Sequence, residues 1–223
     1  MQKYDIMIDV RKIFRKNEQN REAIRQEEAA LLTARLHPHF LFNSITGIRG
    51  LCAEDPALAK EALGSFAVYL RGCLDSLTEE GLIPFSKEME RVESYLALSR
   101  LRYEDRLRVT YDLQEKDFKL PARTVMTLVE CAVKCGVNGN ADGTMITVSA
   151  RSDDTNIVIK VSDDGPGIDP AEHEGIKDIQ DRMDKLCGGT LIFENQRDVG
   201  TTVTVVIPNN YGEQGAYENT GSR

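Results

Sequence analysis

Apolar side chains recur at three- and four-residue steps between charged positions from about Tyr4 to Arg106, as at Met7, Val10 and Phe14. This period matches one face of an amphipathic helix. A charged amphipathic run of this kind predicts a coiled-coil-like stem that joins two copies of the chain. A single solvated helix, packed on its own domain, is the alternative interpretation.

Capping signals divide this region into helices. Asp55 is a good N-cap, and Pro56 suits the first helical position. One long helix is therefore expected to end near Cys52, and a second to run from Pro56 to about Leu77. The period then breaks, and Ser86 is expected to cap a third helix.

The pattern changes after Arg106. Alternating apolar positions predict strands at residues 107–111, 145–149, 157–161, 191–193 and 202–207. Two helical patterns separate them, from Pro121 to about Cys135 and from about Glu174 to Leu186. Strands with helices on one face indicate an α+β two-layer sandwich. We therefore expect a multi-domain chain, with a long-helix dimerisation domain at 1–106, the sandwich at 107–208 and a disordered tail at 209–223.

The composition excludes some classes of function. The 223 residues carry 36 acidic and 28 basic side chains, a net charge of -8, and so lack the basic surplus of a nucleic-acid binder. Five cysteines form no paired framework, which suggests reduced thiols in the cytoplasm. No apolar run approaches the roughly 18–20 residues needed to cross a bilayer. We expect a soluble chain, which could still be the cytoplasmic part of a longer protein.

The most informative segment runs from Leu36 to Asn43. Pro38 distorts the helix beside His39, and Asn43 lies four residues beyond this histidine, on the same helical face. A neutral imidazole can attack a phosphoryl group, and histidine keeps a nucleophilic nitrogen available near pH 7. His39 is therefore a candidate phosphoacceptor, with a structural histidine at a helix kink as the alternative. His37 could be a hydrogen-bonding residue, a second titrating group or a surface residue.

A second set of candidate residues follows the strands. Asp163 stands at a strand end, where a buried carboxylate can accept a hydrogen bond from an exocyclic amino group. Gly165 and Gly167 would let the backbone approach a ligand closely, although the same residues also form an ordinary turn. Gly175 opens a helix whose N–H groups favour phosphate. The last strand begins with a turn and hydroxyl donors, at Gly200, Thr201 and Thr202.

Taken in order, these motifs resemble the LytS/YesM-type sensor histidine kinases over about residues 30 to 208. The resemblance rests on the run from His37 to Asn43, the segment Leu128-Val129-Glu130, the Asp163 and glycine motifs, and the link from Arg102 to Leu107. It implies a dimeric helical phosphotransfer domain followed by a GHKL-type ATP-binding domain. ATP and Mg²⁺ are the implied cofactors, and a response regulator is the implied partner. Relatives of this type can add a membrane-anchored sensor region.

The resemblance also assigns roles to single residues. His39 would be phosphorylated, with Asn43 beside it, and Asp163 would bind the adenine. The phosphate pocket would be shaped by Gly165, Gly167, Gly175 and the turn Gly200-Thr201-Thr202.

One helix departs from the family pattern. The asparagine that normally holds Mg²⁺ is Cys131, and a thiol is a poor ligand for a hard cation. Glu130 could still reach the metal or act as a base, and Lys134 could meet phosphate. Cys131 and Cys135 share a helical face, so they could bind zinc or undergo a redox change. Alternatively, they are small residues that fill an eroded nucleotide site.

The segment over the phosphates departs as well. Only residues 168–174 separate Gly167 from Gly175, so the lid is short. His173 stands where glycine is usual. Asp178 replaces a common asparagine, and its negative charge is unfavourable near phosphate unless it binds the metal.

Two functions follow from these matches and departures. The first is ATP-dependent autophosphorylation of His39 and transfer of the phosphoryl group to an aspartate of a response regulator. The second is a degenerate kinase that acts as a dimeric binding or regulatory module. Phosphorylation of His39 in trans by an active partner fits both.

Overall fold

The computed structural model describes residues 37–76, 78–79, 81–140, 142–167, 174–196 and 199–209. The predicted stem before His37, the lid segment 168–173 and the tail beyond Asn209 lie outside these residues. The chain divides into two compact units, Met1–Asn43 and Ser44–Arg223.

Three helices precede the sheet: α2 (Pro38–Glu54), α3 (Pro56–Asp75) and α4 (Phe85–Tyr103). The expected cap of α3 is confirmed, because the Leu58 N–H donates to Asp55 Oδ1 at 3.0 Å. The expected cap by Ser86 is wrong. Pro84 is the N-cap of α4 and makes no side-chain cap hydrogen bond. Its fixed φ prepares the turn into the helix, and Phe85 anchors the first turn by stacking on Phe118 at 4.5 Å between ring centroids.

A buried arginine of α4 contacts α3 and the segment that follows it. Arg91 is 6% exposed and donates two hydrogen bonds to the Glu79 carboxylate, at 2.7 and 2.8 Å. These bonds hold the pKa of Glu79 at about 2, well below its usual value. Gly72 leaves room for this arginine, because a Cβ there would lie 2.8 Å from Arg91 Cγ.

A five-stranded sheet follows, with strand order β2-β4-β5-β7-β6. Its strands are β2 (Leu107–Leu113), β4 (Thr144–Ser152), β5 (Asn156–Asp163), β6 (Thr190–Gln196) and β7 (Gly200–Pro208). The pair β2–β4 is parallel and the other pairs are antiparallel. All five predicted strands are confirmed.

A small second sheet was not predicted. It pairs β1 (Leu82–Pro84) with β3 (Lys119–Pro121). Pro121 therefore belongs to a strand, and the prediction that a helix begins there is wrong. That helix, α5 (Thr124–Gly139), begins three residues later.

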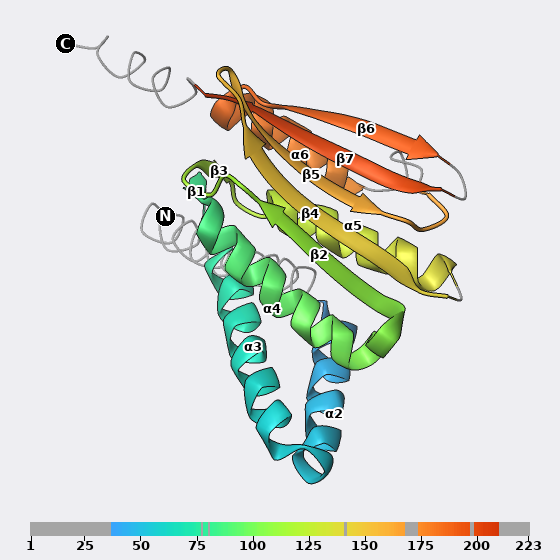
Figure 1. Ribbon diagram of the computed structural model, residues 1–223. Helices are drawn as coiled ribbons and strands as arrows, with labels where there is room; N and C mark the ends of the chain where they lie inside the picture. The colour runs from blue at the N-terminus through green and yellow to red at the C-terminus, as the bar shows by residue number, and fades with distance from the viewer. Residues whose placement is uncertain are drawn as a thin grey trace, which may run out of the picture. The chain divides into compact units, whose positions relative to one another are not determined.

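Helices α5 and α6 (Glu174–Cys187) cover one face of the large sheet (Figure 1). The strand side chains facing them form a dry core in which Ile146, Ile159 and Val205 are fully buried. The other face is polar, as shown by the 2.9 Å hydrogen bond between the hydroxyls of Thr110 and Thr147. The alternation along the strands thus produces the predicted α+β two-layer sandwich after a helical region.

Candidate functional site

The candidate phosphoacceptor lies at the beginning of α2. Pro38 occupies the first helical position, and the His39 side chain is exposed. Asn43 Nδ2 lies 3.2 Å from His39 Nδ1 and 3.4 Å from Nε2, so the two side chains meet as their spacing predicts. His37 adopts a φ of +40°, which is unusual for a residue with a Cβ. We expected Pro38 to distort a helix beside His39, but in the described residues Pro38 begins α2, where a missing N–H costs nothing.

Asp163 ends β5 in a mostly buried position. Burial raises the pKa of this carboxyl group to about 6, against two backbone N–H donors, those of Gly165 and Thr201, that lower it. The Gly165 bond measures 3.0 Å. Asp164 has a different role, because its Oδ1 accepts hydrogen bonds from the Thr144 hydroxyl at 2.9 Å and the Met145 N–H at 2.6 Å. Of the two carboxylates, Asp163 suits ligand binding and Asp164 holds a loop to β4.

The two threonines at the start of β7 face opposite sides of the sheet. Thr201 pairs with Asp163 in the strand register, and its side chain is buried with a hydroxyl that has no partner among the described residues. Thr202 instead donates to Ser162 Oγ at 2.9 Å. A buried hydroxyl without a partner costs about 1–3 kcal/mol, so of the two threonines Thr201 is the one whose hydroxyl keeps unused hydrogen-bonding capacity among the described residues.

The glycines have packing roles around Asp163. A side chain at Gly200, where φ is +134°, would collide with the Asp163 carbonyl, and a Cβ at Gly165 would lie 2.8 Å from Gly136 Cα. Gly167 has a φ of +86°. Gly175 lets α6 approach α5, because a Cβ there would lie 2.9 Å from Thr127 Cγ2. Gly136 was not among the predicted site residues, although a glycine inside a helical pattern was its signal in the sequence.

The helix α5 presents Cys131 towards Asp163. Burial, with smaller contributions from Cys135 and Asp163, raises the pKa of the Cys131 thiol to about 12, so the thiol is protonated at neutral pH. Lys134 is exposed on the same helix. Within the described residues, no group of three or more His, Cys, Asp or Glu side chains could hold a metal ion. The Cys131 thiol thus places a small, uncharged side chain beside Asp163.

Glu130 lies apart from Asp163. Its Oε2 is 3.7 Å from Arg123 Nη2, and it lines a cavity of about 20 Å³ together with Tyr69 and Cys73 of α3. The structure thus brings Asp163, Thr201 and Cys131 together but directs Glu130 to the helical region.

Asp178, at the position where the resemblance expects asparagine, is paired with Arg182 at 3.1 Å in α6. Arg182 also donates to the Ala122 carbonyl. The charge of Asp178 is therefore partly balanced within its own helix. His173 lies outside the described residues.

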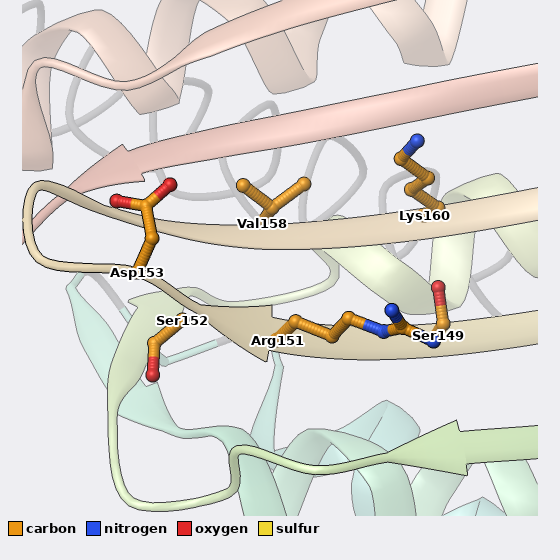
Figure 2. Close-up of a pocket in the computed structure, with 6 residues that line it drawn as sticks. All are labelled: Ser149, Arg151, Ser152, Asp153, Val158 and Lys160. Carbon is orange, nitrogen blue, oxygen red and sulfur yellow. The ribbon is translucent and has the colours of Figure 1, made fainter.

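A separate hollow of about 520 Å³ lies on the polar face of the sheet (Figure 2). It is lined by Ser149, Arg151, Ser152, Asp153, Val158 and Lys160. Arg151 is paired there with Asp112, and Asp153 accepts hydrogen bonds that close the β4–β5 turn. None of the candidate residues from the sequence lines this hollow.

Two family models match the chain. Residues 27–107 match the model described as "Histidine kinase", and residues 116–211 match the model described as "Histidine kinase-, DNA gyrase B-, and HSP90-like ATPase". No helix among the described residues has the length and apolar character needed to cross a membrane.

Curated relatives match most of the chain. YwpD of Bacillus subtilis is 34% identical over 193 residues, which cover 81% of this chain and 69% of YwpD. The sensor protein LytS of Enterococcus faecalis is 28% identical over 205 residues, 83% of this chain and 34% of LytS. The chain thus spans about a third of the length of that LytS.

Among solved structures, the histidine kinase domain of the blue-light activated kinase EL346 from Erythrobacter litoralis has a similar fold. The match covers 86% of this chain and 100% of that domain, with a TM-score of 0.50 and 13% identity.

Proposed function

Because the chain belongs to the LytS-type sensor histidine kinases, we propose that it binds ATP and transfers the γ-phosphoryl group to His39. The phosphoryl group would then pass to an aspartate of a response regulator. The observation that supports this most directly is that Asp163, a mostly buried carboxylate, lies across the strand pair from Thr201, whose hydroxyl has no partner among the described residues. A carboxylate acceptor beside a free hydroxyl suits the exocyclic amino group and ring nitrogens of adenine.

The contribution of the helix to the transfer is positioning. Asn43 Nδ2 lies beside both ring nitrogens of His39, so it can steady the imidazole or donate to a phosphoryl oxygen. In the transfer, a ring nitrogen forms a bond to phosphorus while the bond to the leaving ADP oxygen breaks. The proton on the other ring nitrogen then passes to water at the exposed His39 side chain, which returns the ring to neutrality.

The described residues fit the adenine end of the ligand better than the magnesium end. The Cys131 thiol is protonated and soft, whereas Mg²⁺ prefers oxygen ligands. Glu130, the other candidate ligand, is paired with Arg123. The side chains of Glu130 and Cys131 therefore do not fit a magnesium ion at this position.

Cys131 also favours a second function. A chain that keeps the His39–Asn43 pair but lacks the asparagine for Mg²⁺ could serve as a dimeric regulatory module, or as a phosphoacceptor for an active kinase in trans. Both functions need an accessible His39, which the exposed start of α2 provides.

We propose that the chain works as a homodimer in the cytoplasm, with residues 1–106 as the dimerisation and phosphoacceptor domain and residues 107–208 as the ATP-binding domain. Leu63 and Leu74 on α3 are 52% and 54% exposed and lie on one helical face. All five cysteines are free, which suits a reducing compartment.

Incubation with γ-labelled ATP and Mg²⁺ tests the proposal. Wild type should acquire acid-labile label that His39→Ala abolishes, whereas His37→Ala, a matched control two residues away, should retain it. Asp163→Asn should also lose the label because the nucleotide no longer binds.

The Cys131→Asn variant separates the two functions. If this variant labels and wild type does not, the active-kinase proposal fails and the regulatory function stands. If neither labels alone, labelling of His39 by an added active kinase supports the phosphoacceptor function, and its absence contradicts that function too.

A further inference from the structure

Both ends of α5 are held by charged side chains from one distant segment, which we call the α5 clamp: Glu88 in the first turn of α4 and Arg106 just after α4. Glu88 is fully buried. Its Oε2 accepts from the Arg123 N–H at 3.1 Å and its Oε1 from the Met126 N–H at 3.0 Å. These are N–H groups of the first turn of α5, which has no earlier carbonyls to pair with.

The cap is unusual because it comes from another helix. The N-cap residue of α5 is Arg123, which has a φ of +64° and makes no side-chain cap hydrogen bond. Helix N-caps are normally local Ser, Thr, Asp or Asn side chains. Placing this cap in α4 requires the burial of a carboxylate, which costs free energy. The same burial raises the pKa of Glu88. The nearby guanidinium groups of Arg91 and Arg123 oppose that effect.

Arg106 holds the other end of α5. Its Nη2 donates to the Val137 carbonyl at 2.8 Å and to the Asn140 carbonyl at 3.1 Å. A cation at a helix C-terminus and an anion at the N-terminus both match the helix dipole. Gly143, with a φ of +85°, brings the following loop onto the Arg106 backbone.

Between the two ends, α5 carries one wall of the candidate nucleotide pocket. Cys131 lies on the side of Asp163, and Gly136 lies so close to Gly165 that a Cβ at Gly165 would be 2.8 Å from Gly136 Cα. A small displacement of α5 would therefore change the space beside Asp163. The clamp residues belong to the α4 segment, which Arg91 ties to α3.

We propose that Glu88 and Arg106 are positioning residues, through which the helical region sets the position of α5 and the width of the nucleotide pocket. The pocket assignment rests on the proposed function, but the position of α5 can be measured without nucleotide. Neither residue touches the Asp163 carboxylate, so both act through α5.

Alkylation of individual cysteines measures the position of α5. Glu88→Gln keeps the shape of the side chain but places an amide where two N–H groups need acceptors, and Glu90→Gln in the same helix is its exposed control. Arg106→Gln removes the hydrogen bonds to the C-terminal end of α5. Arg100→Gln is its control, because the Arg100 guanidinium donates to the Val109 carbonyl of β2 rather than to α5.

Each clamp variant should accelerate maleimide labelling of Cys131 and Cys135 by about tenfold, the factor that corresponds to about 1.4 kcal/mol. Labelling of the buried Cys187, read by peptide mass spectrometry in the same sample, should not change. If Cys187 accelerates equally, the variants only lower global stability and the proposal is overturned. Unchanged rates at Cys131 and Cys135 in both variants would overturn it as well.

ADP affinity gives a second readout. Both clamp variants should weaken ADP binding by about tenfold. The double variant should weaken it by less than the product of the two single fold-changes, because both residues act on one helix. If wild type binds no ADP, the proposed function fails, but the cysteine labelling still tests whether Glu88 and Arg106 set the position of α5. If Glu88→Gln does not fold, Arg106→Gln decides alone, since Arg106 is exposed.

Discussion

At the scale of single residues, neighbours of the same type have different roles. Asp163 keeps accepting capacity in a mostly buried site, whereas Asp164 is occupied by Thr144 and Met145. The Thr201 hydroxyl has no partner among the described residues, whereas the Thr202 hydroxyl donates to Ser162 Oγ. In each pair the direction of the side chain from the strand decides which residue can meet a ligand.

Asp163→Asn should separate ligand binding from stability. In the folded chain the pKa of Asp163 is raised to about 6 from 3.8, so above pH 6 the folded state bears the cost of a buried charge. The variant should therefore melt at a higher temperature than wild type at pH 7.5, and this gain should disappear below about pH 4.

The same variant should lose nucleotide. Removing a charged acceptor costs about 1.5–3 kcal/mol, so ADP affinity should fall by roughly 10–100-fold. Wild-type affinity should itself decline as the pH falls through 6, because the protonated carboxyl group accepts less well. Calorimetric titration from pH 5 to 8 checks both; a pH-independent wild-type affinity would contradict the role of Asp163.

Thr201→Val should also raise stability and lower ADP affinity at neutral pH. Valine removes a buried hydroxyl without a partner, so the free energy of unfolding should rise by about 1 kcal/mol while ADP affinity falls. Thr202→Val is the control and should lower stability, because it breaks the bond to Ser162. Urea denaturation and ADP titration measure the two effects, and a loss of stability in Thr201→Val would count against a free hydroxyl.

At the scale of elements, α5 is the helix that connects the helical region to the candidate nucleotide site. Its apolar face is fully buried, with Val125 and Val129 at 0% exposure, and its ends are capped by Glu88 and Arg106. Glu130 and Cys131 are adjacent in sequence but face different neighbours, α3 and Asp163. One helix therefore contacts both the helical region and the candidate nucleotide site.

Gly136→Ala tests how closely α5 approaches the sheet. The new Cβ would lie within 2.5–2.8 Å of Thr144 side-chain atoms, so the variant should lose about 1–3 kcal/mol of stability. Gly64→Ala in α3 has no atom within 4 Å of the new Cβ and should gain about 0.5–1 kcal/mol. Urea denaturation of both variants gives the comparison, and equal effects would show that α5 has room to move.

At the scale of the whole molecule, the helical region exposes apolar side chains that the sheet layer does not cover. Leu63 and Leu74 lie on one face of α3 and are more than half exposed. Exposed apolar stripes on a helix commonly mark a partner helix. A second copy of the chain is the occupant that the proposed dimer requires.

Charged substitutions on that stripe should dissociate the dimer. Wild type should have twice the mass of one chain in light scattering, whereas Leu63→Asp with Leu74→Asp should shift it to the monomer. Leu186→Asp, an exposed leucine on α6, is the control and should stay dimeric. A monomeric wild type, or a dimeric double variant, would contradict this interface.

The strands and long helices could be predicted from the sequence because their signals are local. Period-2 alternation located all five strands of the large sheet, and Asp55-Pro56 located the start of α3. The strands β1 and β3 could not be found, because each has three residues and forms only by pairing across more than thirty positions. The cap at Ser86 failed for a related reason, since Pro84 and the packing of Phe85 set the start of α4.

The candidate site could be predicted from the sequence to about the same extent as the fold. The sequence by itself determined the family, the His39–Asn43 pair and the Asp163 and glycine motifs, because these depend on residue type and spacing. Only the tertiary structure decided that Thr201 is the free hydroxyl, that Glu130 faces α3, and that Glu88 and Arg106 cap α5. Those roles depend on contacts between residues far apart in the chain, and such contacts form only when burial and hydrogen bonding bring the segments together.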